Sequence, residues 1–285
     1  MRKNVDAPIV LTRYLYIKDD VWTSLLMSIL TKDIEQTFFW TCEMYHSGFE
    51  AELAEYLFTI YGEFFKAKNP RLEKYLCDWS NIILDGPHIA ATMARNLVSS
   101  PRLFTVKDFE TTNDETIIDP ESFCETRLII HVKQDSIDKY NTIYTDDRQK
   151  RPARKILQEA CLYSTCKNMM ELFHCNHNSV ETTKLCEYHR TDHHWVYFAS
   201  FSPIWNKRIV VCNGVIDHET YRVDFSDDDL EEFYEEYGYD PDEQDPKVSA
   251  KIMHITREPQ ITMKAFCCMF NKTKTIRMKK KLFTS

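Results

Sequence analysis

The sequence has little glycine: only five occur among 285 residues, at Gly48, Gly62, Gly86, Gly214 and Gly238. Nucleotide-binding α/β folds and small β-sandwiches use glycine in tight turns and phosphate loops, so this scarcity favours helix. Neither GxGxxG nor GxxxxGKS/T occurs, which argues against a Rossmann or P-loop site. The catalytic signatures GxSxG and HExxH are missing as well.

Long apolar runs and an excess of positive charge are also missing. No apolar run approaches the ~20 residues that span a bilayer, and Asp6, Pro8 and Arg13 interrupt the apolar region that a signal peptide needs. We therefore expect a protein on the cytosolic side of membranes, with no membrane partner. Its net charge of −8 is opposite in sign to that of proteins that coat nucleic acid. The ten cysteines are expected to be mainly reduced.

Aromatic residues, in contrast, concentrate between Asp33 and Pro70. Apolar residues recur at helical spacing on both sides of Gly48, which is the pattern of two amphipathic helices. The stretch therefore predicts an αα-hairpin with a tight turn at Gly48. It holds more large rings than one buried face needs, so we expect some of them to contact a protein partner. The candidates are Trp40, Tyr45, Phe49 and Tyr56.

Further helices are expected on either side of this hairpin, so the predicted fold class is mainly α. Residues 1–102 are expected to form an N-terminal array of helical hairpins of the HEAT-like kind. Residues 103–151 are polar and turn-rich, which predicts a connecting or inserted segment with one strand-like run at Arg127–Val132. Residues 152–285 are expected to form an α+β region with a few short strands and a basic tail.

Three elements are expected within this C-terminal region. Apolar spacing predicts one long helix from Pro152 to Phe173. Residues 203–212 fit either a helix, which Ser202-Pro203 would start, or a strand, because RIVV at 208–211 is β-branched. TYRVDF at 220–225 predicts a short strand.

A cluster of cysteine and histidine is the sharpest candidate for chemistry. Cys175-x-His177 and Cys186-x2-His189 could supply the four nitrogen and sulfur ligands of a tetrahedral zinc. The spacer of the first pair is shorter than zinc sites usually have, and packed thiols with a solvated histidine-rich loop are the competing interpretation. No cofactor is expected, and structural zinc stays the alternative. An enzyme that uses zinc or a cysteine nucleophile is a further alternative.

Two segments are strongly basic, RQKRPARK at 148–155 and the tail KTKTIRMKKK at 272–281. Such runs either contact phosphate or form solvated surface, and the acidic segment 224–247 could also pair with them. A replication or transcription accessory protein that contacts nucleic acid is therefore an alternative function. The residues involved would be Arg148, Lys150, Arg151, Arg154, Lys155, Lys279, Lys280 and Lys281.

The hairpin and its flank, SLLMSILTKDIEQTFFWTCEMYHSGFEAELAEYLFTIYGEFFKAKNP, resemble a segment of uncharacterised proteins of giant nucleocytoplasmic large DNA viruses, of the mimivirus and phycodnavirus kind. Met44 and His46 depart from the family pattern. A second likeness covers HHWVYFASFSPIWNKRI and Phe233–Gln244. Neither stretch holds a catalytic motif, so the resemblance implies lineage and fold rather than activity. The positions that match the family pattern are Trp40, Glu43, Tyr45, Ser47, Gly48, Phe49, Glu50, Asn69 and Pro70.

Taken together, these patterns predict a non-enzymatic viral scaffold for protein interaction, with a helical docking domain. The resemblance places it in the host cytoplasm, at a viral factory, or in the virion. A partner would bind the hairpin aromatics and an acidic helix within 226–246. The apolar stripe of this helix is Leu230, Phe233, Tyr234 and Tyr237, and its three aromatic residues are the expected contacts. No small-molecule substrate is indicated. A translation-initiation scaffold that docks a helicase is an alternative that rests on HEAT-like fold analogy alone.

Overall fold

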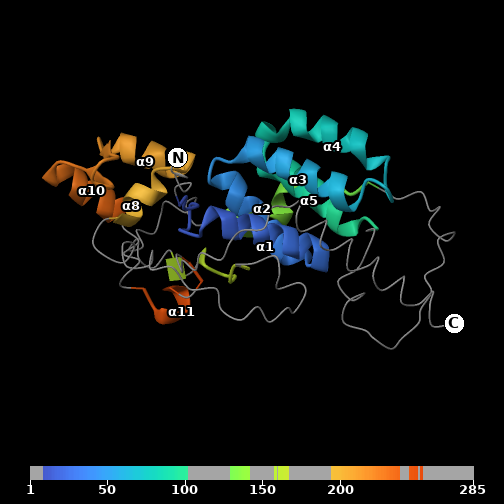
Figure 1. Ribbon diagram of the computed structural model, residues 1–285, viewed down its shortest axis with the longest axis horizontal. Helices are drawn as coiled ribbons and strands as arrows, with labels where there is room; N and C mark the ends of the chain where they lie inside the picture. The colour runs from blue at the N-terminus through green and yellow to red at the C-terminus, as the bar shows by residue number, and fades with distance from the viewer. Residues whose placement is uncertain are drawn as a thin grey trace, which may run out of the picture.

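The computed structural model describes residues 9–101, 129–141, 157–158, 160–166, 194–237, 244–249 and 251–252. These parts of the chain form ten α-helices, three of them of six residues or fewer, and one two-stranded antiparallel sheet (Figure 1). The prediction of a mainly helical chain with short strands in its C-terminal region is confirmed. Residues 103–128 of the expected connecting segment lie outside the described residues, so the domain limits stay predictions.

Five helices make up the N-terminal part. In Figure 1, α2 lies between α1 and α3, and α4 covers the outer side of α3. α2 packs mainly against α1 and α5, and α5 also contacts α1, α3 and α4. In a solenoid each repeat contacts only its neighbours, whereas here the fifth helix returns to the first three, so the HEAT-like array is not confirmed. The elements are α1 (Lys18–Thr31), α2 (Ile34–His46), α3 (Glu50–Phe64), α4 (Leu72–Asn81), the 3₁₀ turn η1 (Ile83–Asp85) and α5 (Pro87–Ser99).

Local signals explain where these helices begin. The Asp33 carboxylate caps α2 by accepting a 3.0 Å hydrogen bond from the Gln36 backbone N–H. Pro87 occupies the first turn of α5, where a missing N–H costs nothing. Gly48 lies between α2 and α3 with a φ of +89°, a left-handed value that favours glycine. The predicted hairpin of two helices with a turn at Gly48 is therefore confirmed.

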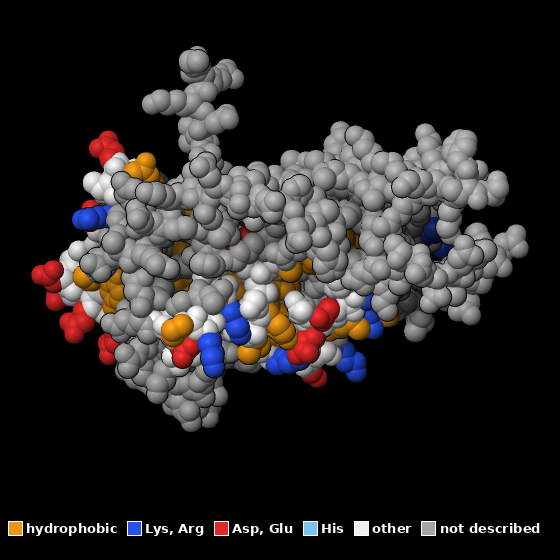
Figure 2. All heavy atoms as spheres, turned by 60° about the horizontal axis from the view of Figure 1, so that its bottom comes forward, with side chains coloured by type: hydrophobic (Ala, Val, Ile, Leu, Met, Phe, Trp, Pro, Cys, Tyr) orange, Lys and Arg blue, Asp and Glu red, His pale blue; other side chains and the backbone are white. Residues whose placement is uncertain are grey.

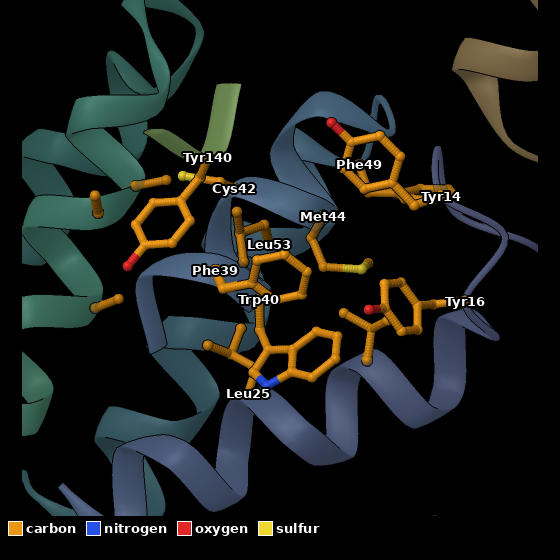
Figure 3. Packing of buried hydrophobic residues seen from close by; sticks show 14 of the residues in the cluster. Tyr14, Tyr16, Leu25, Phe39, Trp40, Cys42, Met44, Phe49, Leu53 and Tyr140 are labelled. Carbon is orange, nitrogen blue, oxygen red and sulfur yellow. The ribbon is translucent and has the colours of Figure 1, made fainter. Parts of the chain in front are cut away.

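Large aromatic side chains fill the core around α2. Figure 3 shows Trp40 and Phe39 reaching from α2 toward Tyr16 and the side chains of α1. The ring centroids of Trp40 lie 4.8 Å from Phe39 and 5.1 Å from Tyr16, both in edge-to-face geometry. Such pairs contribute about 0.5–1.5 kcal/mol beyond the area they bury. The rings of the predicted hairpin are therefore mostly packing groups.

Residues 129–133 lie beside α5 without forming a strand, which corrects the strand-like reading of Arg127–Val132 over its described part. The Asn96 side chain replaces a strand partner: its Nδ2 donates to the Ile130 carbonyl (2.7 Å) and its Oδ1 accepts from the Ile130 N–H (3.1 Å). The Val132 N–H donates to Thr92 Oγ1 at 2.9 Å. The 3₁₀ turn η4 (Gln134–Ser136) and α6 (Asp138–Asn141) follow.

Residues 161–166 are not helical, so the single helix expected from Pro152 to Phe173 is wrong over this span. Backbone groups of residues 161–166 form hydrogen bonds with residues distant in sequence instead. The carbonyls of Cys161 and Leu162 accept from Lys251 Nζ (3.0 and 3.1 Å), and the Cys166 N–H donates to Ser24 Oγ (2.7 Å). For the Cys161 and Leu162 carbonyls and the Cys166 N–H, these long-range partners replace the i to i−4 bonds that apolar spacing alone would favour.

Three of the C-terminal helices lie together at one end of the molecule, on the left of Figure 1, where they are labelled α8, α9 and α10. Residues 203–211 form a helix rather than a strand, because Ser202 Oγ accepts from the Trp205 N–H and Pro203 stands in the first turn. The strand expected within 220–225 is confirmed as β2, and its partner β1 was not predicted; the register pairs Val215 with Asp224. The elements are α8 (His194–Ala199), α9 (Pro203–Val211), β1 (Val215–Asp217), β2 (Arg222–Asp224), α10 (Asp227–Tyr237) and α11 (Pro246–Ser249).

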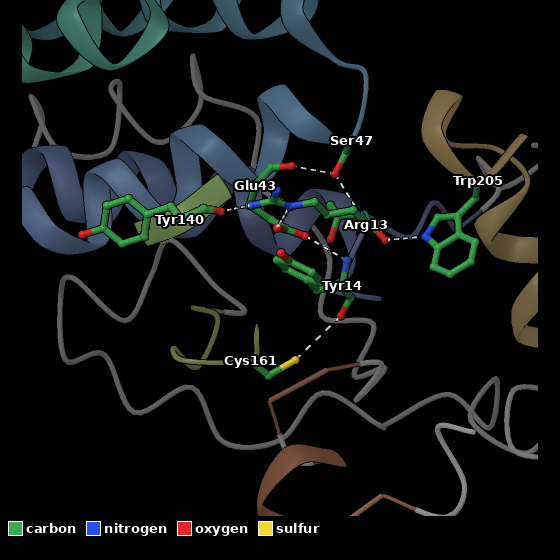
Figure 4. Close-up of polar contacts among 8 residues, drawn as sticks. Arg13, Tyr14, Glu43, Ser47, Tyr140, Cys161 and Trp205 are labelled. Atoms are coloured by element: carbon green, nitrogen blue, oxygen red, sulfur yellow. Dashed lines mark hydrogen bonds and ion pairs between the residues drawn. The ribbon is translucent and has the colours of Figure 1, made fainter. Parts of the chain in front are cut away.

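A buried ion pair anchors the loop that precedes α1. Arg13 Nε donates to Glu43 Oε2 of α2 at 2.8 Å, with 3% and 0% of the two side chains exposed (Figure 4). Arg13 Nη2 donates to the Tyr140 carbonyl at 2.7 Å, and the Arg13 N–H donates to Ser47 Oγ at 2.9 Å. Glu43 Oε1 accepts from the Tyr14 N–H at 3.1 Å. One arginine thus connects α2 with α6.

Residues from later parts of the chain also form hydrogen bonds with this loop or beside it. Trp205 Nε1 of α9 donates to the Thr12 carbonyl at 2.9 Å, and Cys161 Sγ donates to the Tyr14 carbonyl at 3.8 Å. The Ile204 N–H donates to the Ser47 carbonyl at 3.2 Å. We call residues 11–17 the hub loop, because hydrogen bonds from four separate parts of the described chain converge on or beside it.

Candidate functional site

A hollow lies between α3 and the corner where α4 runs into η1. Its volume is about 740 Å³. We call it the α3–η1 groove. It is lined by Ala51, Ala54, Glu55, Phe58 and Thr59 of α3, and by Ser80, Asn81, Ile83 and Leu84 of the corner.

The sequence explains why this space is open. Helix α3 presents two alanines, Ala51 and Ala54, to the groove, and a methyl side chain fills little of it. Helix α4 ends at Asn81, and the chain continues as a 3₁₀ turn with three residues per turn. Ile83 therefore turns into the core with 4% of its surface exposed, while the next residue, Leu84, is 75% exposed.

Leu84 is the most exposed of the large hydrophobic residues in the described chain, and Ile82 beside it is 43% exposed. An aliphatic side chain that stands in water beside an apolar hollow is typical of interaction surfaces rather than of cores. The sequence holds a weak signal for this feature. Ile82-Ile83-Leu84 is an apolar run directly before Asp85-Gly86-Pro87, at a place where helical spacing ends.

Tyr45 of α2 lies at one margin of the groove. Its hydroxyl donates to the Leu84 carbonyl at 3.4 Å, and its side chain is half-buried. Burial raises the pKa of Tyr45, and the negative charges of Glu50 and Asp85 raise it further. Two carboxylates thus lie near one phenol at this margin. Tyr45 is the one expected partner residue of the hairpin that lies at the groove.

The other three hairpin candidates serve the core or close contacts within the chain. Trp40 is fully buried, and Phe49 is 5% exposed with Lys18 Nζ 3.9 Å from its ring centroid. Tyr56 is half-buried, and its hydroxyl donates to the Trp22 carbonyl at 2.9 Å. Burial raises the pKa of Tyr56. The expectation that Trp40 and Phe49 contact a partner is corrected, because neither side chain offers a free surface.

The three expected contact residues of the acidic helix α10 also differ in how deeply they are buried. Phe233 is fully buried, 4.8 Å from the Phe225 ring centroid, which corrects the expectation that it contacts a partner. Tyr234 and Tyr237 are half-buried. The Arg208 guanidinium lies 5.0 Å from the Tyr237 ring centroid. Burial, helped by Glu236, raises the pKa of Tyr237 to about 12.

The outer face of α10 is strongly acidic. Figure 2 shows acidic side chains gathered at the left end of the molecule, where Figure 1 places this helix. The Asp229 N–H donates to Ser226 Oγ at 3.3 Å, which confirms that the helix begins near Ser226. Asp227 and Asp228 follow in the first turn, where negative charge meets the positive end of the helix dipole.

Two buried thiols lie close to the Arg13–Glu43 pair but are poor nucleophiles. Burial raises the pKa of Cys42 to about 12, and burial together with the Glu43 charge does the same for Cys161. Only the thiolate attacks, so these thiols stay unreactive near neutral pH. Within the described residues the free cysteines are Cys42, Cys77, Cys161, Cys166 and Cys212.

The remaining sequence candidates lie outside the described residues. These are the zinc candidates Cys175, His177, Cys186 and His189, and the basic residues Arg148, Lys150, Arg151, Arg154, Lys155, Lys279, Lys280 and Lys281. Over the described ranges, histidine, cysteine and acidic side chains form no group of three that could hold a metal ion. None of the described helices combines the length and the apolar character that crossing a membrane requires.

Comparison with known proteins adds no relative. No protein-family model matches the chain, and no curated protein and no solved structure matches it either. The resemblance to proteins of giant viruses therefore stays a prediction from the quoted residues.

Proposed function

We propose that the protein is a non-enzymatic interaction scaffold whose helical domain docks a segment of a partner protein in the α3–η1 groove. The observation that carries the proposal is the position of Leu84, which stands 75% exposed at the margin of an apolar hollow of about 740 Å³. The occupant is an amphipathic segment that places an aliphatic side chain between Ala54 and Leu84.

Two features of the groove support this occupant. Its apolar lining includes Ala51, Ala54 and Ile83, so an aliphatic anchor would exchange water for apolar contacts. Its margin carries Thr59, Ser80 and Asn81, whose polar groups can meet the polar side of the segment. Burying one aliphatic side chain contributes about 1.5–3 kcal/mol, which is enough for a central anchor in an otherwise polar contact.

The groove replaces most of the surface that the sequence predicted. Tyr45 keeps a place at its margin, while Trp40 and Phe49 are buried and do not line it. A viral origin, and a place in the host cytoplasm or the virion, are further parts of the proposal and rest on the resemblance alone. Roles in translation initiation, nucleic-acid contact or zinc chemistry stay alternatives that no described residue favours over docking.

A peptide-display selection tests the proposal. The full chain is immobilised and random peptides of about four helical turns are selected against it, with Leu84→Asp and Val215→Asp as parallel targets. Val215 is 65% exposed on β1 and does not line the groove, so it controls for the added charge. We expect peptide families that bind wild type and Val215→Asp and lose binding to Leu84→Asp. Families that bind all three proteins equally would exclude the groove as the docking site.

A further inference from the structure

The charges around the α3–η1 groove indicate which segment it takes. Glu55 lines the groove, Glu50 precedes the lining residue Ala51, and Asp85 follows Leu84 directly. Within the described residues, none of these three carboxylates forms an ion pair. No lysine or arginine lines the groove. Its margin therefore carries negative charge that takes part in none of the ion pairs found in the described part of the chain.

Two of these three carboxylates, Glu50 and Asp85, lie at one end of the groove. Glu50 begins α3, and the Tyr45 hydroxyl, which donates to the Leu84 carbonyl at 3.4 Å, feels the charges of both Glu50 and Asp85. The lining then continues along α3 from Ala51 to Thr59, about 12 Å at ~1.5 Å per residue. That length accommodates roughly two turns of a partner helix, with Glu50 and Asp85 at the end beside Tyr45, Glu55 midway along, and neutral polar groups at the far end.

We propose that the occupant is a basic amphipathic segment, with aliphatic side chains in the groove and lysine or arginine at the end next to Tyr45, Glu50 and Asp85. The inference rests on the proposed function, because it names the partner class of the same groove. The aliphatic side chains fill the hollow beside Leu84, and the cations pair with carboxylates that are otherwise unpaired. The carboxylates set the direction in which the segment lies.

The exposure of these carboxylates determines how much their ion pairs contribute to the affinity for the segment. An ion pair between exposed groups changes affinity by roughly two- to fivefold, so two such pairs change it by about five- to twentyfold. This contribution weakens with added salt, because the Debye length falls to ~3 Å at 1 M salt. The apolar contribution of Leu84 is not screened.

Three designed helical peptides of about four turns test the partner class. All share one leucine face, and their other positions are lysine, glutamine or glutamate. Fluorescence anisotropy measures their binding to the full wild-type chain and to three variants. Glu50→Gln/Asp85→Asn removes the two charges next to Tyr45 and leaves Glu55, Glu231→Gln/Glu235→Gln removes two exposed charges from α10 as the matched control, and Leu84→Asp places a charge at the apolar margin of the groove. Circular dichroism confirms that each variant is folded.

We expect the leucine–lysine peptide to bind best, and to bind Glu50→Gln/Asp85→Asn about five- to twentyfold more weakly than wild type or the α10 control. Equal weakening by both charge variants would overturn the basic-segment inference, because net charge alone would then explain the preference. If Leu84→Asp leaves binding of the leucine–glutamine peptide unchanged, the proposed function itself fails. Absence of binding by all three peptides to wild type would overturn both.

Discussion

Arg13 and Glu43 form an ion pair in which almost no part of either side chain meets solvent, with 2.8 Å between Nε and Oε2. Burial by itself would lower the pKa of Arg13, but the surrounding Tyr14 and Glu43 outweigh it and the pKa is raised. The cost of removing two charges from water is offset by further hydrogen bonds to the Tyr140 carbonyl and from the Tyr14 N–H. The pair therefore specifies how the hub loop, α2 and α6 fit together.

Removing one member of this pair is expected to destabilise the fold strongly. Glu43→Gln keeps the shape of the side chain and leaves the Arg13 guanidinium buried without its counter-charge, so the free energy of unfolding should fall by about 3–5 kcal/mol. Urea unfolding followed by circular dichroism measures the change.

Lys66→Ala is the matched control, because Lys66 and Glu73 form a 2.7 Å ion pair with 53% and 38% of their side chains exposed. Its effect should stay close to experimental error. The double variant Arg13→Met/Glu43→Gln should lose less stability than the sum of its single variants. Simple additivity in this cycle would show that the two side chains are not energetically coupled.

Two glycines should respond in opposite directions to alanine. Gly48 has a φ of +89°, and an added Cβ would lie 2.5 Å from the Pro203 Cβ, so Gly48→Ala should lower the free energy of unfolding by about 2–4 kcal/mol. Gly62 lies within α3 with nothing within 4 Å of an added Cβ. Gly62→Ala should raise stability by up to about 1 kcal/mol. Thermal unfolding of both variants measures the two changes in stability, and changes in the same direction would contradict the structure.

Stability should fall at alkaline pH because of the buried thiols. The pKa of Cys42 and of Cys161 is about 12 in the folded protein, against 9.0 for a free thiol. The folded state keeps these protons while the unfolded state loses them. The stabilisation is therefore complete below pH 9.0 and is lost as the pH rises toward 12. Each thiol should lower the free energy of unfolding by about 1.4 kcal/mol per pH unit in this window.

Urea unfolding at several pH values measures this slope, and Cys42→Ala should make it shallower by about 1.4 kcal/mol per pH unit. Alkylation followed by peptide mapping gives an independent reading. The exposed Cys77 should react in the folded protein, whereas Cys42 and Cys161 should react only after unfolding. Rapid alkylation of Cys42 in the folded chain at neutral pH would be inconsistent with its burial.

The hydrogen bonds that hold residues 129–132 against α5 predict a local change without global unfolding. Thr92→Val has nearly the same shape as threonine but cannot accept the 2.9 Å hydrogen bond from the Val132 N–H, whereas Thr92→Ser can. Leaving that N–H unpaired costs about 1–3 kcal/mol. Hydrogen exchange at Val132 should therefore become faster in Thr92→Val and stay nearly unchanged in Thr92→Ser. Equal protection in both variants would mean that Thr92 does not hold this segment.

The helices could be predicted from sequence because their signals are local. The Asp33 cap, Gly48 and Pro87 mark the limits of α2, α3 and α5 within one turn of the observed ends. The conformation of residues 129–133 could not be predicted. Their β-branched residues indicated a strand, but the Asn96 and Thr92 side chains, rather than a second strand, form hydrogen bonds with their backbone. Such a partner depends on the tertiary fold, which residue spacing does not contain.

The candidate site was largely hidden for the same reason. Aromatic content pointed to Trp40 and Phe233 as contact residues, yet large rings contribute most where they are buried, and both belong to the core. Leu84 looks like any apolar residue in sequence. Its exposure results from the change from α4 to a 3₁₀ turn, which points Ile83 inward and leaves Leu84 outside.

The hub loop has a consequence for how the chain folds during synthesis. The Thr12 carbonyl cannot accept its hydrogen bond until Trp205 has been added 193 residues later. The Tyr14 carbonyl cannot bond to Cys161 until 147 residues later. At ~5–20 residues per second, the ribosome needs roughly 10–40 s to add the stretch between Thr12 and Trp205. The Tyr140 carbonyl, which accepts from Arg13 Nη2, follows Arg13 by 127 residues, so before that point the guanidinium has only Glu43 of these two partners. We therefore expect the hub loop to stay incomplete in the nascent chain until its distant partners have been added, which leaves the kind of exposed surface that chaperones cover in general.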